Sequence, residues 1–347
     1  MPWQWISRIL NRDQLIGNQH EKMPNVSYSS TKDPKQIGLD ESAESPVNEL
    51  SQVLETAFFC WLLDCDNSDL QIDSEQRQHK VQTILKALDQ DALSLDKIPR
   101  RPSSFPLLIK LLNSDNTSNK EIADALLADP ALATQTLKTA NSPFFRTSSE
   151  TIESVDRAVF MLGSQGIRNI ISATVMMPMI KGNNSQEAVF SKKVWQWGLL
   201  SATASDQYSY LQGDTAGPIY LLGLLPALTY LLIYQSLQSY QNTHPSSNEI
   251  EPSVIRTVIQ ERSWRLCHDI CQQWGLPPSS NKYLLDAERP SPATPNTPLR
   301  DGIFIGTHKV LQASSRSPIG DQQAFLLSGA SNRVNRKVIQ YLSERVN

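Results

Sequence analysis

Histidine and cysteine, the side chains best suited to metal binding and acid–base chemistry, are sparse in this chain of 347 residues. Cys267 and Cys271 stand four positions apart, so on a helix they would share one face, with His268 adjacent. A zinc site there would need two further ligands, and isolated cysteines usually behave as small buried hydrophobes, so a core role is favoured. The histidines are scattered along the chain and are His20, His79, His244, His268 and His308.

Motifs of other catalytic and binding classes are missing from the sequence. It contains no G-x-S-x-G, no P-loop and no H-E-x-x-H. Four cysteines in so long a chain do not fit the disulfide framework of a small secreted domain. The net charge of -3 argues against broad nucleic-acid binding, which needs clustered Lys and Arg. We therefore expect no nucleic-acid partner.

Local signals at residues 118–140 predict two consecutive helices. Ser118 and Glu121 have the S-x-x-E spacing of a capping box, in which each side chain bonds the other residue's backbone N–H. Asp129 and Pro130 then stop one helix and start the next, because Asp is a good N-cap and proline at the first helical position loses no hydrogen bond.

Residues 141–163 continue this pattern with a break and a third helix. Asn141-Ser142-Pro143 ends the second helix, since the residue before a proline is pushed out of the α region. The third helix is predicted over 155–162, introduced by Ser154 and ended by Gly163 as a C′ glycine. The stretch therefore reads as three short helices with defined ends.

The same stretch resembles the core signature of a known family. DPALATQTLKTANSPFF (129–145), followed by IESVDRAVFMLGSQGIRNII (152–171), closely resembles HDOD domains, which are bacterial signalling modules. Proline-rich 99–106 and W-G-L-P at 274–277 also resemble that family. The resemblance implies an all-α fold related to the HD and HD-GYP metal-dependent phosphohydrolases. Its structural signature residues here are Asp129, Pro130, Asn141 and Gly163.

The resemblance also indicates where HD metal ligands would stand. Trp197 occupies the position of the first histidine, and Pro226 and Ala227 occupy those of the histidine–aspartate pair. Ser263 stands where the next histidine is expected, and the last pair would fall near 287–288. We call Trp197, Pro226, Ala227 and Ser263 the vestigial HD-site positions. Because the ligands are replaced, the resemblance implies a protein without catalysis or a metal cofactor; His268 is the one nearby histidine that an unexpected site could recruit.

Three further residues have two interpretations each. Asn141 and Ser142 could contact a ligand or partner, although capping of the broken helix is the favoured interpretation. Trp195 and Trp197 flank the former metal position. They either fill its volume, which is favoured, or line a pocket for a planar ligand.

The organisation that we expect has four parts. Residues 1–45 hold a short amphipathic segment (3–12) and a polar linker (17–45), and 46–98 hold an antiparallel pair of helices at 47–64 and 74–92. The HDOD domain is expected at 99–290, followed at 291–347 by a proline-rich connection and closing helices. The further expected helices lie at 107–113, 167–177, 189–211, 219–237, 252–274, 299–313 and 321–346.

The sequence favours a cytoplasmic protein without a membrane span. The first residues lack the three parts of a signal peptide, which are a basic region, a long apolar stretch and a cleavage site with small residues. The apolar run at 219–234 is about 24 Å long as a helix, against roughly 30 Å of hydrocarbon, and it contains Pro226. A buried core helix is therefore the favoured interpretation of this run.

These observations predict a non-catalytic bacterial signal-transduction module that acts through protein–protein contacts. The family context suggests unknown partners in two-component or cyclic-di-GMP pathways, although the chain has no receiver, GGDEF or EAL motif. Two alternatives stay open: a divergent metal-dependent phosphohydrolase, and a sensor that binds a nucleotide or small ligand in the vestigial HD pocket. A homo-oligomer is also open.

Overall fold

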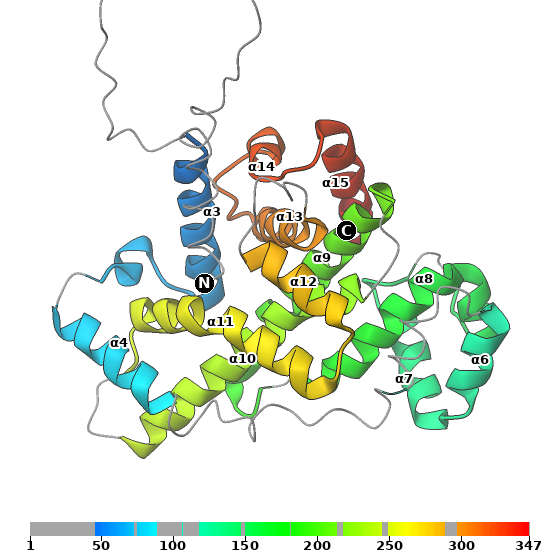
Figure 1. Ribbon diagram of the computed structural model, residues 1–347, viewed down its shortest axis with the longest axis horizontal. Coiled ribbons are helices and arrows are strands. Elements are labelled where there is room, and N and C mark those ends of the chain that lie inside the picture. The colour runs from blue at the N-terminus through cyan, green and yellow to red at the C-terminus, as the bar shows by residue number, and fades with distance from the viewer. Residues whose placement is uncertain are drawn as a thin grey trace, which may run out of the picture.

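The computed structural model of the protein is all-α, as the sequence predicts (Figure 1). It describes residues 46–72, 75–88, 106, 118–146, 150–180, 182–213, 218–244, 249–288 and 297–346, and within these ranges no strand occurs. The segments expected at 3–12, 17–45 and 107–113, and most of the proline-rich stretches at 99–106 and 290–298, lie outside the described residues.

Three long helices form the centre of the fold: α9 (Ser185–Leu211), α10 (Ile219–Thr243) and α13 (Pro298–Ala313). Helix α9 packs along both α13 and α10, and α11 (Pro252–Trp274) and α12 (Pro278–Glu288) follow α10 around the body. The sequence did not predict α12 as a helix, and it predicted that α10 would end six residues earlier. Helix α13 was expected as a closing element, yet nearly all its side chains are buried.

Small residues allow α13 to lie very close to α9. A Cβ added at Gly302 would stand 2.5 Å from the Ser205 Cα, and one added at Gly306 would stand 2.6 Å from the Ser201 Cα. Real Cβ atoms essentially never approach other atoms that closely. The backbones therefore approach where glycine faces serine, and this contact fixes the position of the C-terminal helices on the body.

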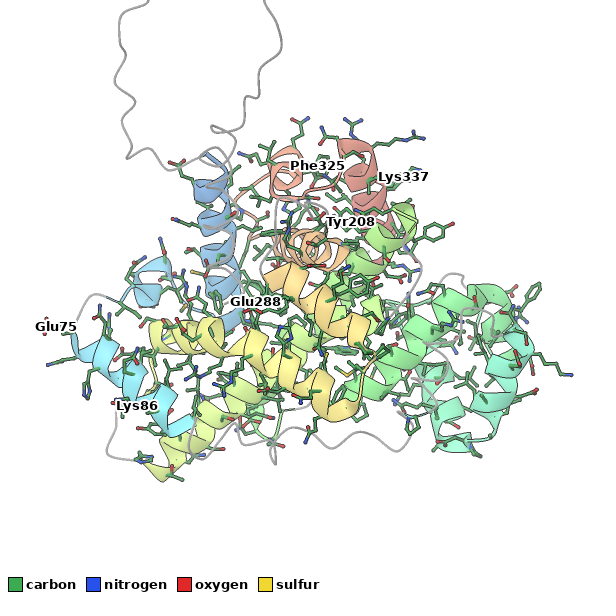
Figure 2. All side chains as sticks on the ribbon, viewed as in Figure 1. Glu75, Lys86, Tyr208, Glu288, Phe325 and Lys337 are labelled. Atoms are coloured by element: carbon green, nitrogen blue, oxygen red, sulfur yellow. The ribbon has the colours of Figure 1, made fainter. Side chains whose placement is uncertain are left out.

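The two N-terminal helices expected at 47–64 and 74–92 both form, and each of them packs on the body. Helix α3 (Pro46–Leu63) lies against α9, α13 and α14 (Asp321–Leu327), whereas α4 (Glu75–Ala87) lies against α11. A 3-10 turn, η1 (Asn67–Leu70), joins them and contacts both α3 and α11. In Figure 2, Glu75 and Lys86 mark the two ends of α4 at the outer edge of the molecule. A single helix cannot bury its own apolar face, so the apolar faces of α3 and α4 are each buried against the body.

A lobe of three helices projects from the body: α6 (Asn119–Leu127), α7 (Pro130–Ala140) and the first half of α8 (Val155–Met176). The predicted caps are confirmed. Glu121 Oε2 accepts from the Ser118 backbone N–H at 2.7 Å, and Asp129 Oδ1 accepts from the backbone N–H groups of Ala131 (3.1 Å) and Leu132 (3.0 Å). Local chemistry therefore sets these helix ends as the sequence implies.

Two boundaries differ from the prediction. Gly163 leaves the helical region (φ +68°), as a C′ glycine does, but a new helical turn follows at once, so the break is a kink inside α8. The helix expected at 321–346 is split into α14 and α15 (Asn332–Val346). The split is stabilised by the buried Asn335 side chain, which accepts from the Tyr208 hydroxyl at 2.5 Å and from the Ser328 hydroxyl at 3.0 Å.

Among the described residues, one helix is long and apolar enough to cross a membrane on length and composition alone: Ile219–Thr243, which is α10. Of its apolar window, 78% is buried inside the protein against neighbouring helices. The helix occupies the place of a core helix between α9 and α11.

Candidate functional site

The vestigial HD-site positions stand on three neighbouring helices. Trp197 belongs to α9, Pro226 and Ala227 to α10, and Ser263 to α11, and all four are buried. Helix α10 packs against both α9 and α11. A Cβ added at Gly198 would lie 2.7 Å from the Ala227 Cβ, so α9 and α10 meet closely at these positions. No side chain among the four is a metal ligand of the HD type.

An aromatic cluster fills the space beside Trp197. The ring centroid of Trp197 lies 4.9 Å from that of Phe58 on α3 and 4.9 Å from that of Tyr230 on α10. Phe59 stacks on Tyr230 at 6.3 Å, and Phe58 also contacts Trp61 at 5.8 Å. These separations are those of packed aromatic pairs, so no room for a nucleotide is left between the rings. We call Phe58, Phe59, Trp61, Trp197 and Tyr230 the aromatic plug.

Hydrogen bonds hold the plug in one arrangement. The Trp197 indole N–H donates to the Thr307 hydroxyl at 2.9 Å, and that hydroxyl donates to the Ile303 carbonyl at 2.8 Å. Helix α13 therefore fixes the orientation of the indole. A buried indole N–H needs such a partner, because leaving it unpaired would cost about 1–3 kcal/mol. On the α11 side, the buried Ser263 hydroxyl has no hydrogen-bond partner among the described residues.

Histidines elsewhere in the described chain do not converge. His268 lies 3.2 Å from the Glu288 carboxylate and 3.4 Å from the Asn281 side chain, and its pKa is raised, chiefly by the hydrogen bond to Glu288. Buried His308 bonds Asp321 (2.8 Å) instead. Within the described ranges, no group of three or more His, Cys, Asp or Glu side chains could hold a metal ion. Of the described side chains, the pair His268 and Glu288 comes nearest to forming a metal site at unexpected positions.

The remaining predicted contact residues lie away from the plug. The Asn141 side chain donates to the carbonyls of Leu137 (2.9 Å) and Ile152 (2.9 Å) and accepts from the Ile152 N–H (2.8 Å). Ser142 donates to the Thr139 carbonyl at 2.7 Å. Trp195 on α9 is half-buried against the core. The hydrogen bonds of Asn141 therefore tie α7 to the segment that leads into α8, and that of Ser142 satisfies a carbonyl in the last turn of α7.

The cysteines are reduced thiols. Cys267 and Cys271 are fully or almost fully buried, and Cys267 Sγ lies 3.8 Å from the Thr229 hydroxyl. Burial raises the pKa of both thiols. Cys60 and Cys65 are partly exposed near the end of α3, and burial raises their pKa values as well, that of Cys65 to about 12. A raised pKa disfavours the thiolate form in which cysteine ligates metals.

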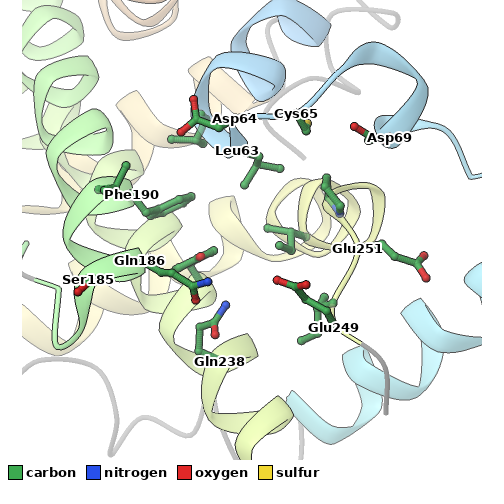
Figure 3. A pocket seen from close by; sticks show the side chains of 16 residues that line it. Leu63, Asp64, Cys65, Asp69, Ser185, Gln186, Phe190, Gln238, Glu249 and Glu251 are labelled. Atoms are coloured by element: carbon green, nitrogen blue, oxygen red, sulfur yellow. The ribbon is translucent and has the colours of Figure 1, made fainter.

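The sequence did not indicate a cleft that opens where the N-terminal helices meet the body (Figure 3). It has a volume of about 720 Å³ and is lined by the end of α3, η1, the first turns of α9, the middle of α10 and residues 249–255. Figure 3 shows the side chains of Gln186, Gln238 and Glu249 around a common space. We call it the junction cleft. It is formed by segments far apart in sequence, so no local pattern could have revealed it.

Two ion pairs brace this junction. Lys193 of α9 lies 2.5 Å from the Asp64 carboxylate and donates to the Trp61 carbonyl at 2.7 Å, which satisfies a backbone group at the end of α3. Arg77 of α4 pairs with Glu251 at 2.8 Å. The cleft walls are therefore held by the same contacts that attach α3 and α4 to the body.

Solved structures share this fold. A proposed phosphohydrolase from Shewanella amazonensis SB2B has a TM-score of 0.51 at 16% identity, with 76% of this chain and 96% of that chain covered. A proposed metal-dependent phosphohydrolase from the same organism has a TM-score of 0.50 at 15% identity, with 79% and 100% covered. A proposed signal transduction protein from Marinobacter aquaeolei VT8 has a TM-score of 0.50 at 16% identity, with 81% and 66% covered. At such identities the likeness concerns the fold alone.

Sequence comparison gives one family and no curated relative. The model of the HDOD domain family matches residues 98–290, which is more than half of the chain. No curated protein matches the chain. The resemblance seen in the signature at 129–171 is therefore confirmed over the full extent of a domain.

Proposed function

Because this chain belongs to the HDOD domain family, we propose that it is a signal-transduction module that works through protein–protein contacts and catalyses no reaction. One observation supports this proposal: Trp197, which stands where the resemblance places the first HD histidine, is packed into the aromatic plug. Metal-assisted phosphoester hydrolysis needs several imidazoles and a carboxylate around one open coordination site. Trp197 and Ala227 supply no ligand atom, and Pro226 also removes a backbone N–H.

The plug also weighs against a sensor that binds its ligand at the vestigial HD site. The rings of Phe58, Trp197 and Tyr230 are in mutual contact and fully buried. A nucleotide could enter only if α3 left the body and carried Phe58 with it. Such a displacement would expose the whole plug to water, and each large aromatic side chain loses about 1.5–3 kcal/mol of transfer free energy on exposure.

The test of the proposal is the metal content of untagged protein purified natively, together with its phosphodiesterase activity on linear and cyclic dinucleotides. We expect less than one-tenth of an equivalent of manganese, iron, zinc or nickel, and no hydrolysis above the buffer rate. His268→Ala and Glu288→Gln provide the matched control. If the wild-type protein holds metal and loses it in these variants, the protein is a divergent phosphohydrolase and the proposal is wrong.

The second part of the test concerns contacts with partners. The chain is used to capture proteins from the native cell, and candidates are then purified and titrated against it. We expect a saturable complex of defined stoichiometry that forms without added metal or nucleotide. A protein that binds no partner but gains thermal stability with a nucleotide would support the sensor alternative, because a ligand at 100 times its Kd stabilises by about 2.7 kcal/mol.

A further inference from the structure

The junction cleft has an acidic rim. Four of its lining residues are carboxylates, and its lining contains no Lys or Arg from the described part of the chain. Asp64 already faces Lys193 and Arg316, and Glu251 already faces Arg77 and Lys80. Asp69 and Glu249 are exposed, and no ion pair among the described residues engages either of them. An occupant that carries positive charge is therefore favoured over a phosphate-bearing one.

The interior of the same cleft is apolar and aromatic. The rings of Phe190 and Tyr234 stack at 4.1 Å between centroids with an interplanar angle of 6°, and they form part of its wall. Leu63 and Ile250 line it as well, and Val189 on α9 keeps 52% of its surface exposed beside them. An apolar wall beneath an acidic rim fits a segment that presents aromatic and aliphatic side chains together with cations.

The chain itself contains a segment of this chemistry. Residues 3–12 read WQWISRILNR, with two tryptophans, three branched aliphatic residues and two arginines, and without a carboxylate. This segment lies outside the described residues. We propose that it binds in the junction cleft of its own chain, with Trp3, Ile6 and Leu10, which share one face at helical spacing, against the apolar wall and Arg8 and Arg12 near the Asp69 and Glu249 carboxylates.

The chain is long enough for this contact within one molecule. Helix α3 has 18 residues and is about 27 Å long, and the cleft lies at its C-terminal end, beside Leu63. Residues 13–45 connect the segment to the start of α3, and such a connection spans at most about 110 Å. Because the segment is tethered, its effective concentration at the cleft is of the order of mM, so even modest contacts would keep the cleft occupied.

The contact would give the cleft a resident occupant that any partner must displace. A partner segment with the same mixture of aromatic and basic side chains would compete with residues 3–12, whereas an anionic ligand would not. The protein–protein function proposed above does not depend on this contact, since the plug and the cleft are different sites.

The experiment is site-specific photo-crosslinking in the full-length chain. Trp3 is replaced by p-benzoylphenylalanine, and the crosslinked peptides are identified by mass spectrometry after irradiation at low protein concentration. We expect crosslinks within one chain to the α9, α10 or 249–255 walls of the cleft. Glu249→Lys should lower their yield at least about threefold, as should Arg8→Glu with Arg12→Glu, which corresponds to the loss of surface-exposed charge pairs.

Two controls make the result specific. Glu153→Lys places the same charge change on the exposed surface of the α6–α8 lobe and should leave the yield unchanged. Combining Glu249→Lys with Arg8→Glu should restore the yield, because the charges are exchanged and not removed. Circular dichroism of each variant checks that the helical fold is intact.

Other outcomes would overturn the proposal. Crosslinks to the α6–α8 lobe would place the segment elsewhere, and crosslinks found only between two chains would make a second copy the occupant. An unchanged yield in Glu249→Lys would show that the acidic rim does not attract the segment. The absence of any crosslink would mean that the cleft is open to external partners.

Discussion

At the residue scale, the feature that most affects the chemistry of the molecule is the buried charge of Glu55 on α3. Its carboxylate accepts a hydrogen bond from Arg256 at 3.2 Å and another from Gln260, both on α11, and only 6% of the residue is exposed. Burial raises the pKa of Glu55 to about 7, because desolvation outweighs the attraction of Arg256. Asp206 on α9 is similar, since burial raises its pKa to about 6 against the hydrogen bonds from Asn169 and Gln165.

These two carboxyl groups predict that stability falls as the pH rises from about 4.5 to 7. In that range the unfolded chain releases the Glu55 proton while the folded protein keeps it, so folding becomes less favourable. The loss is complete above the folded pKa of about 7 and amounts to at most about 3 kcal/mol for Glu55. Glu55→Gln should flatten this decline in urea unfolding measured from pH 4 to 8.

The control for this pH dependence is Glu75→Gln, which changes an exposed carboxylate in the first turn of α4. It should leave the profile as in the wild type. A Glu55→Gln profile as steep as that of the wild type would mean that water reaches the carboxylate at the α3–α11 contact. Asp206→Asn should remove the part of the decline that lies between pH 4 and 6.

At the scale of elements, the crossing of α9 and α13 determines how the C-terminal third joins the body. Gly302 and Gly306 stand one turn apart on α13 and face Ser205 and Ser201, which are one turn apart on α9. Ser205 donates to the Ser201 carbonyl at 2.8 Å and also lies 3.4 Å from the Leu299 carbonyl of α13, whereas the buried Ser201 hydroxyl has no hydrogen-bond partner among the described residues. The backbones can meet this closely because the facing residues are glycine and serine.

Adding one methyl group at this crossing should be costly. Gly302→Ala and Gly306→Ala should each lower the free energy of unfolding by about 1–3 kcal/mol, because backbone atoms of α9 would have to move. The higher helix propensity of alanine favours folding by up to about 1 kcal/mol, so a measured loss understates the clash. Urea unfolding is the measurement, and Gly320→Ala, whose Cβ would be 3.9 Å from its nearest neighbour, is the matched control. Equal midpoints for Gly302→Ala and Gly320→Ala would contradict a close crossing.

At the scale of the whole molecule, the family domain and its flanking helices share one core. The plug combines Phe58 from α3 with Trp197 and Tyr230 from the HDOD domain at 98–290. Thr307 from α13, which lies beyond that domain, orients Trp197. The lobe of α6 and α7, in contrast, packs mainly on α8. The molecule thus has a central unit and a lobe with few contacts beyond its own helices, although both belong to the same family domain.

This arrangement predicts the pattern of native-state hydrogen exchange. Amides of α3 should exchange as slowly as those of α9 and α13, while those of α6 and α7 should exchange faster through local opening. Phe58→Ala should speed exchange in α9, α10 and α13 together, since truncating a buried phenylalanine costs about 3–5 kcal/mol. Val53→Ala, on an exposed part of the same helix, should change little. If α3 alone exchanged fast, it would be an attachment and not part of the core.

The sequence by itself determined the helical class, most helix ends and the family. Ser118 with Glu121, and Asp129 with Pro130, set their helix ends through bonds within four positions, so their identity and spacing suffice. Gly275 likewise ends α11 in the left-handed conformation (φ +67°). The resemblance to the family also predicts the vestigial HD-site positions, and their replacement of metal ligands stays a prediction.

Only the tertiary structure decided what fills those positions and where a ligand could bind. Phe58 and Thr307 lie more than a hundred positions from Trp197, and their meeting depends on the packing of whole helices. For the same reason only the structure shows which helices cover the apolar faces of α3 and α4, since an apolar face specifies burial and not a partner. The break between α14 and α15 follows from the Tyr208–Asn335 bond, and the junction cleft from four separated segments, so neither leaves a periodic signal.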